Sequence, residues 1–199
     1  MRPTIKRNFV LLLAIAAVAA PWAGAQDAAP SQALRAELAI DYSYMRSNEP
    51  PGGCTCFNLN GGSASFAWPI GSSHFALAGD VTIAHAGSIS SAGDSLTLSI
   101  FTAGARYLPK MRRARVQPFG EALVGVVHSS GTLVQGGNSG AANAGAAFAS
   151  NIGGGLDLNA SRRWAIRLIE ADYLLTTVDN GSNNHENNLR IGAGVVVRF

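Results

Sequence analysis

The sequence predicts an all-β protein, an eight-stranded antiparallel up-and-down transmembrane β-barrel. Three observations support this fold. Apolar residues alternate with small or polar residues in eight segments of the chain, which is the period of a β-strand. Most of these segments exceed the usual globular strand of about 5–6 residues and are long enough for a tilted strand of about 9–11 residues to cross a bilayer. The connections between them alternate between longer and shorter.

The N-terminal part of the chain has the pattern of a secretory signal peptide. Three of the first eight residues are basic, an apolar run follows over 9–20, and Ala23-Gly24-Ala25 is a small-residue cleavage site. The apolar run is too short for a transmembrane helix, which needs about 20 residues. The expected division of the chain is a signal peptide at 1–25, a short N-terminal segment at 26–32 and the barrel at 33–199.

The first four expected strands cover 34–44, 63–68, 75–84 and 96–107. Even positions of the first two strands and odd positions of the third are mostly Leu, Ile, Val or aromatic. The fourth strand breaks this pattern, because Leu96, Leu98 and Ile100 share one phase whereas Tyr107 takes the other. We therefore expect an irregularity between Ile100 and Tyr107 that keeps both groups on the apolar face.

The last four expected strands cover 115–128, 148–158, 163–177 and 188–199. The apolar phase of the seventh changes near Leu168–Ile169. A β-bulge at this point would turn Arg167, Glu170 and Asp172 to the interior. The eighth strand alternates most regularly, with apolar residues at its odd positions up to Phe199.

Connections and aromatic residues both sort into two levels. The expected long connections cover 46–58, 86–95, 129–146 and 178–187, and the short ones cover 69–74, 108–114 and 159–162. Trp68, Phe75, Tyr107, Trp164 and Phe199 fall near the short connections, and Tyr42, Tyr44 and Tyr173 near the long ones. Transmembrane barrels have short turns at one end, longer loops at the other, and an aromatic girdle at each interface.

The second face of the strands carries small residues and a few charges of both signs. In a transmembrane barrel this face lines the interior, and eight strands leave room there for side chains but not for an open pore. Buried charges must be paired and hydrogen-bonded. The expected interior ion-pair network consists of Arg35, Glu37, Asp41, Asp80, Glu121, Glu170, Asp172, Arg190 and Arg198. A gated path for protons or ions through the same groups is the alternative.

With these features the chain resembles the small OmpA/OmpX-type outer-membrane barrels of Gram-negative bacteria, over nearly all of 33–199. The last strand, with Val195, Val197 and a terminal Phe199 at alternate positions, resembles the signal that the barrel-assembly machinery reads. The resemblance implies a location in the cell outer membrane and contact with its lipid and lipopolysaccharide. It also implies a structural or surface-interaction role in the envelope. We expect a monomer, a loop surface available to an extracellular ligand, and no peptidoglycan-binding domain.

Other functions have weaker support in the sequence. His128 and Ser130 have the spacing of an outer-membrane lipid A deacylase motif, but the residues that follow, 131–156, contain no Asp or Glu to orient the histidine. A soluble exported lipocalin-like binder would need a polar exterior. Without the three basic residues near the N-terminus, basic and acidic residues are equal in number, which does not favour nucleic acid. No cofactor or metal is expected, and Cys54 and Cys56 lack the spacing of a zinc site.

Overall fold

The computed structural model describes residues 35–47, 56–87, 89, 93, 95–109, 114–131, 146–178 and 185–199. The predictions for 1–25 and 26–32 lie outside these residues. The described residues form the strands β1 (Glu37–Ser47), β2 (Phe57–Pro69), β3 (Phe75–Ala86), β4 (Leu96–Tyr107), β5 (Val116–Ser130), β6 (Ala146–Asn159), β7 (Trp164–Thr176) and β8 (Glu186–Arg198). Among the described residues, no helix is long and apolar enough to cross a membrane.

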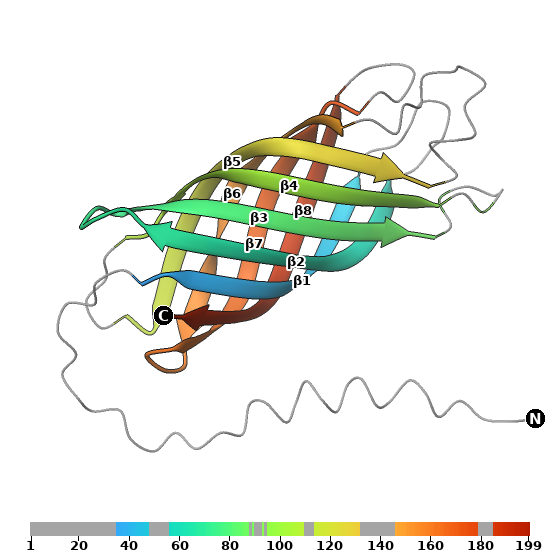
Figure 1. The fold of residues 1–199 in the computed structure, drawn as a ribbon. Helices are drawn as coiled ribbons and strands as arrows, with labels where there is room; N and C mark the ends of the chain where they lie inside the picture. The colour runs from blue at the N-terminus through green and yellow to red at the C-terminus, as the bar shows by residue number, and fades with distance from the viewer. Residues whose placement is uncertain are drawn as a thin grey trace, which may run out of the picture. The chain divides into compact units, whose positions relative to one another are not determined.

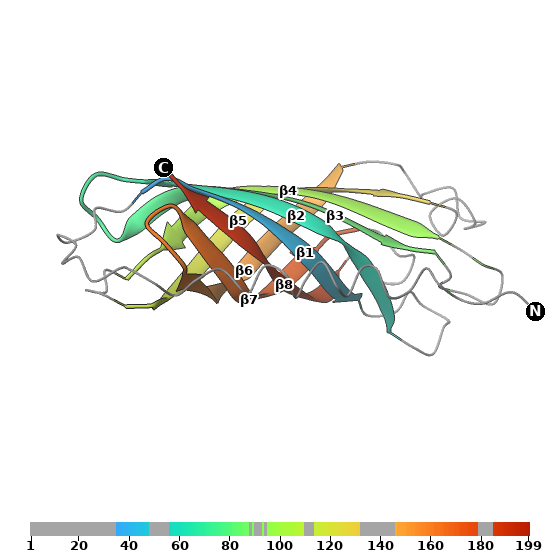
Figure 2. The ribbon, with the colours of Figure 1, turned by 90° about the horizontal axis from the view of Figure 1, so that it is seen from below.

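The eight strands of the described chain close into an antiparallel barrel in sequence order, with β1 paired to both β2 and β8. The predicted fold class is therefore confirmed. Figure 1 shows the tilted strands around a common axis, with the β2–β3 turn, the β6–β7 turn and the C-terminus at one end. The view in Figure 2 shows the same end, where β8 finishes beside the start of β1. The β2–β3 turn includes Gly71 with a φ of 56°, a left-handed conformation that suits glycine.

The exterior of the barrel is apolar. Every strand places large hydrophobic side chains on this face, with exposed fractions such as 66% for Ile40, 62% for Ile152 and 63% for Trp68. Residues of the opposite parity are buried, as in β1, where exposed and buried positions alternate along the strand. The predicted lipid-facing sets of the first, third and eighth segments lie on this exterior face, apart from Leu34, which is outside the described residues.

The predicted bulge in β7 is confirmed. The pairing of β7 with β8 shifts register between Arg167 and Glu170, and Leu168 and Ile169 both face outward. The shift places Arg167, Glu170 and Asp172 in the interior. The bulge therefore changes the parity of the strand so that charged residues on both sides of it share the interior face.

The predicted irregularity in β4 is wrong. The strand pairs with β3 and with β5 in unbroken register over Leu96–Tyr107. Leu96, Leu98 and Ile100 face inward, where they are buried, and Phe101 and Tyr107 face outward. The change of apolar phase thus reports an apolar region inside the barrel rather than an extra residue in the strand.

The interior is layered along the barrel axis. An apolar cluster fills the end where β1 joins β2, and it includes Met45, Leu59, Leu98, Val127 and Leu174. A smaller cluster with Ala67, Ala76, Leu108, Phe119 and Leu123 lies toward the other end. The charged side chains extend from the middle of the same interior to the short-turn end, where Glu37 and Arg198 pair. Because these side chains are almost completely buried, the described residues fill the barrel and leave no open channel between them.

Glycines on β6 make room for the interior side chains, which gives a first testable prediction. A Cβ atom on Gly153 would lie 2.0 Å from the Oδ1 atom of Asp172 and 2.4 Å from the carbonyl oxygen of Ala171. We expect Gly153→Ala to lower the free energy of unfolding by about 1–3 kcal/mol, the usual cost of overpacking. Urea unfolding of the barrel in lipid vesicles measures this change. Gly62→Ala is the matched control, because its Cβ would meet nothing closer than 3.5 Å. Equal stability of the two variants would contradict the prediction.

Candidate functional site

The interior of the described barrel contains eleven buried charged residues, which we call the lumen network. They are Glu37, Asp41, Asp80, Arg106, Glu121, Asp157, Arg167, Glu170, Asp172, Arg190 and Arg198. Seven are carboxylates and four are arginines. Each arginine makes an ion pair with at least one of these carboxylates, as buried charges require.

Arg167 on β7 is a hub of the lumen network. Its guanidinium group lies 3.1 Å from Asp41 on β1, 3.0 Å from Asp157 on β6 and 2.5 Å from Glu170 on its own strand. The side chain is fully buried, and its Cζ atom lies 4.5 Å from the centre of the Phe119 ring. Three carboxylates and an aromatic ring therefore share this buried cation, which is the only ion-pair partner of Asp41 among the described residues.

Arg190 on β8 is the second hub. It lies 2.8 Å from Asp80 on β3, 2.7 Å from Glu170 and 2.6 Å from Asp172 on β7, and it also donates a hydrogen bond to Thr82. Glu170 accepts hydrogen bonds from Arg190 through Oε1 and from Arg167 through Oε2. This carboxylate thus joins the two hubs directly.

The network continues toward the end of the barrel that contains the short turns. Arg198 lies 2.6 Å from Glu37 and 3.5 Å from Asp157, and it donates a hydrogen bond to Asn159. Because Asp157 also pairs with Arg167, the C-terminal end of β8 is linked to the first hub.

Arg106 connects β4 and β5 to the same network. It lies 2.7 Å from Glu121, and its Cζ atom lies 4.6 Å from the centre of the Phe119 ring. Phe119 is therefore in cation–π contact with both Arg106 and Arg167. The two arginines also donate hydrogen bonds of 3.3 Å to the hydroxyl group of Ser65 on β2. With Ser65 included, the lumen network joins all eight strands.

Several of these contacts connect strands that are not neighbours in the sheet. Asp41 and Arg167 belong to β1 and β7, which β8 separates, and Asp80 and Arg190 belong to β3 and β8, which β1 and β2 separate. The ion pairs thus cross the interior, whereas backbone hydrogen bonds act only between adjacent strands. Such contacts hold the barrel closed in one register.

The structure places most of the predicted interior charges in the lumen network. Glu37, Asp41, Asp80, Glu121, Glu170, Asp172, Arg190 and Arg198 are all buried there. Arg35 corrects the prediction, because it is exposed just before β1 and donates to the carbonyl group of Arg162 instead. Arg35 precedes Glu37, the first residue of β1 that pairs with a neighbouring strand. The alternation of inward and outward side chains therefore does not extend to it.

The prediction of the network omitted Arg106 and Asp157. A signal for both was present, because Arg106 has the parity of Thr102 and Asp157 has the parity of Gly153, all of them on the inward face. Arg167 was expected inside on account of the bulge, and the structure adds its partners Asp41 and Asp157.

Three carboxylates of the network are close enough to consider a metal ion. Oxygen atoms of Glu121, Glu170 and Asp172 lie within 4.8 Å of one another. Each of these carboxylates already accepts a hydrogen bond from an arginine, Glu121 from Arg106 and the other two from Arg190. Cations already occupy positions beside all three, so the arrangement is one of ion pairs.

The exterior face at the opposite end carries tyrosine–asparagine pairs. The hydroxyl groups of Tyr42 and Tyr44 on β1 donate to Asn60 and Asn58 on β2 at 2.6 and 2.8 Å, and Tyr173 on β7 donates to Asn187 on β8. In each pair, the asparagine gives the phenol hydroxyl group a hydrogen-bond acceptor at the edge of the apolar surface. An aromatic ring with a polar tip suits the boundary between lipid and water.

The aromatic residues of the short-turn end are also on the exterior. Trp68, Phe75, Tyr107, Trp164 and Phe199 are all exposed, and the rings of Phe75 and Tyr107 lie 5.4 Å apart. The two groups of aromatic residues therefore lie at the two ends of one apolar surface, as a pair of interfacial girdles would.

The structure places His128 and Ser130 on the exterior face of β5, where both are exposed. The adjacent strand β4 contains no carboxylate, and the carboxylate of β6, Asp157, is buried in the lumen network. Among the described residues, no acidic group of these two strands is available to orient His128. Within the described part of the chain, the histidine and serine therefore do not form a complete catalytic triad.

The outward-facing side of β8, continued by the residue after it, carries Val195, Val197 and Phe199. Val195 and Phe199 are exposed, and the backbone amide of Phe199 donates to the carbonyl group of Ala36 at 2.9 Å. Their predicted role in assembly remains a prediction.

Cys56 is exposed just before β2, and Cys54 lies outside the described residues.

Comparison with known proteins gives matches at the level of structure. Neisserial surface protein A matches with a TM-score of 0.60 and 16% identity, covering 82% of this chain and 97% of that one. Ail, the attachment invasion locus protein of Yersinia pestis, gives 0.51 and 16%, covering 83% and 100%. The E. coli outer membrane protein W gives 0.51 and 13%, covering 85% and 100%. The chain has the fold of the small outer-membrane β-barrels.

No protein-family model and no curated protein sequence matches the chain. With sequence identities of 13–16%, the likeness concerns the backbone architecture. The function of the chain must be argued from its own surfaces and interior.

Proposed function

We propose that the protein is an outer-membrane β-barrel with a structural or surface-interaction role in the cell envelope. The observation that carries this proposal is the inverted polarity of the barrel: large apolar side chains cover all eight strands outside, and a connected set of ion pairs is buried inside. In water such an exterior would aggregate, whereas in lipid it is the stable arrangement. A soluble lipocalin-like binder would show the opposite arrangement.

The filled interior supports a role other than that of an open pore. Hub residues such as Arg167 and apolar residues such as Met45 and Val127 are almost inaccessible to water. The incomplete His128 and Ser130 pair gives no support to the deacylase alternative. The surfaces left for function are the two ends of the barrel and the lipid-facing exterior.

Mobility on SDS gels tests the membrane proposal directly. The isolated outer-membrane fraction is run with and without boiling. We expect the protein in this fraction and a difference in mobility, because a closed barrel resists SDS until it is heated. A periplasmic protein with the same mobility in both lanes would overturn the proposal.

The orientation of the barrel gives a second test, and the native cysteines supply the probe. We expect a membrane-impermeant maleimide to label the native cysteines, Cys54 and Cys56, on intact, mildly reduced cells, because Cys56 lies just before β2 at the end opposite the short turns. The matched control replaces both with Ser and adds Ser72→Cys in the β2–β3 turn, which should react only after the outer membrane is permeabilised. Labelling of the control on intact cells would show the reverse orientation.

A further inference from the structure

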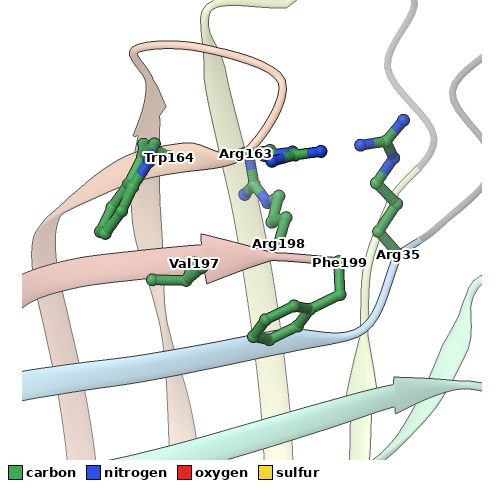
Figure 3. A pocket seen from close by; sticks show the side chains of 6 residues that line it. All are labelled: Arg35, Arg163, Trp164, Val197, Arg198 and Phe199. Carbon is green, nitrogen blue, oxygen red and sulfur yellow. The ribbon is translucent and has the colours of Figure 1, made fainter.

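A pocket of about 680 Å³ lies at the short-turn end of the barrel. Its lining residues are Arg35, Arg163, Trp164, Val197, Arg198 and Phe199. They come from the segment before β1, the start of β7 and the end of β8, and Figure 3 shows them around the end of the β8 arrow. A volume of this size is in the range of small-ligand sites, which is roughly 300–1,000 Å³.

Two arginines make this pocket cationic. Arg35 and Arg163 are exposed, and neither forms an ion pair with a carboxylate among the described residues, the carboxyl group of Phe199 included. Seven of the described acidic residues are buried in the lumen network, and the remaining one, Glu186, begins β8 at the opposite end. Among the described residues, the acidic side chains that could neutralise these arginines are therefore on the other side of the barrel wall or at its far end.

The other wall of the pocket is apolar and belongs to the exterior face. Trp164 is 53% exposed and Phe199 70%, and Trp164 is the pairing partner of Val197 across β7 and β8. These side chains continue the apolar belt, so the pocket opens toward lipid along this side. Aromatic side chains at this level mark the boundary between acyl chains and headgroups.

We infer that this pocket binds an anionic phospholipid of the periplasmic leaflet. The phosphate group lies between the guanidinium groups of Arg35 and Arg163, and the upper acyl chains pack on Trp164, Val197 and Phe199. Charge-assisted hydrogen bonds from arginine suit a phosphodiester, and the apolar wall suits the chains attached to it. This inference depends on the proposed location in the outer membrane.

Tryptophan fluorescence provides a site-specific test, because the chain has only three tryptophans, Trp22, Trp68 and Trp164. The double variant W22F/W68F, inserted in phosphatidylcholine vesicles, reports from Trp164 alone. Brominated phosphatidylglycerol or brominated phosphatidylcholine is added at equal mole fraction, and bromine on the acyl chains quenches only a tryptophan beside that lipid. We expect selective quenching by the anionic lipid, with a preference on the order of fivefold for each arginine near the surface.

Two controls separate this site from a general surface effect. Adding Arg35→Gln and Arg163→Gln should remove the preference, and Arg163→Gln alone should reduce it. The variant W22F/W68F/W164F/Y107W reports from a tryptophan on β4, which lies across the barrel from β8, in place of an exposed residue at the same end, and it should show no comparable preference.

The outcomes also distinguish this inference from the proposed function. Equal quenching by the two lipids at Trp164, or a preference that survives removal of both arginines, would overturn the phospholipid site while leaving the membrane barrel intact. A chain that fails to insert in vesicles and shows no gel shift on boiling would overturn the proposed function itself.

Discussion

Replacement of Arg167 by methionine is expected to destabilise the barrel strongly. The variant removes the cation that Asp41, Asp157 and Glu170 share and leaves their charges buried. Removing one partner of a buried ion pair costs about 3–5 kcal/mol. Here Asp41 loses its only ion-pair partner among the described residues, whereas Asp157 and Glu170 keep their pairs with Arg198 and Arg190. Urea unfolding of the protein in phospholipid vesicles, followed by gel mobility and fluorescence, measures the loss.

Two further variants make this expectation specific. Arg46→Met changes an exposed arginine on the same apolar exterior as Tyr42 and Tyr44, and it should alter stability by less than about 1 kcal/mol. Asp41→Asn added to Arg167→Met should recover part of the loss, because it removes the charge that loses its only described ion-pair partner. If Arg167→Met unfolded within about 1 kcal/mol of the native protein, with a cost like that of Arg46→Met, the network would not hold the barrel closed.

Deletion of Phe199 is expected to separate assembly in the cell from stability of the folded barrel. In the structure this residue is 70% exposed, and its amide donates one hydrogen bond to Ala36. A single hydrogen bond contributes about 1 kcal/mol, so the barrel refolded in vesicles should be almost as stable as the full chain. In cells, most of the protein should be missing from the outer membrane, because the predicted assembly signal would be incomplete.

The comparison needs a control of similar size at the same end. Phe75→Ala removes another exposed ring, which contacts Tyr107, but leaves the C-terminal pattern unchanged. We expect near-normal levels of this variant in the outer membrane. Normal levels of the Phe199 deletion would remove the argument that Val195, Val197 and Phe199 act as an assembly signal.

The sequence alone supports the predictions for Phe199 and Arg167 to different degrees. The C-terminal pattern is visible in the sequence, because strict alternation over one strand needs no knowledge of the neighbouring strands. The importance of Arg167 is visible only in part. The change of apolar phase at Leu168–Ile169 predicts that it points inward, but its partners on β1 and β6 lie 126 and 10 positions away in the chain.

The incorrect expectation for β4 shows a limit of alternation as a signal. Leu98 and Ile100 were assigned to the lipid face because they are apolar, yet they are buried inside with Met45 and Leu59. A barrel has two apolar environments, the lipid outside and the apolar cluster inside. The hydrophobicity of a side chain does not distinguish them, whereas the register with neighbouring strands does.

Arg35 shows that alternation is also a limited signal for predicting which charged side chains lie inside the barrel. Its parity matches that of Glu37 and Asp41, but it precedes the first paired residue of β1 and remains exposed. There it lines the pocket with Arg163, which is distant in sequence and adjacent in the closed barrel. This pocket could not be predicted from either segment separately.

The fold class, the approximate positions of the strands, the exterior face of most strands and the bulge in β7 follow from local patterns, because a strand turns successive side chains to opposite sides whatever its neighbours are. The pairing of charges across the interior and the pocket beside Phe199 depend on closure. Closure brings β8 beside β1 and sets the stagger of the strands. Contacts such as Asp80 with Arg190, 110 positions apart, exist only in that geometry, since nothing in the local sequence of β3 or β8 specifies the distance between them.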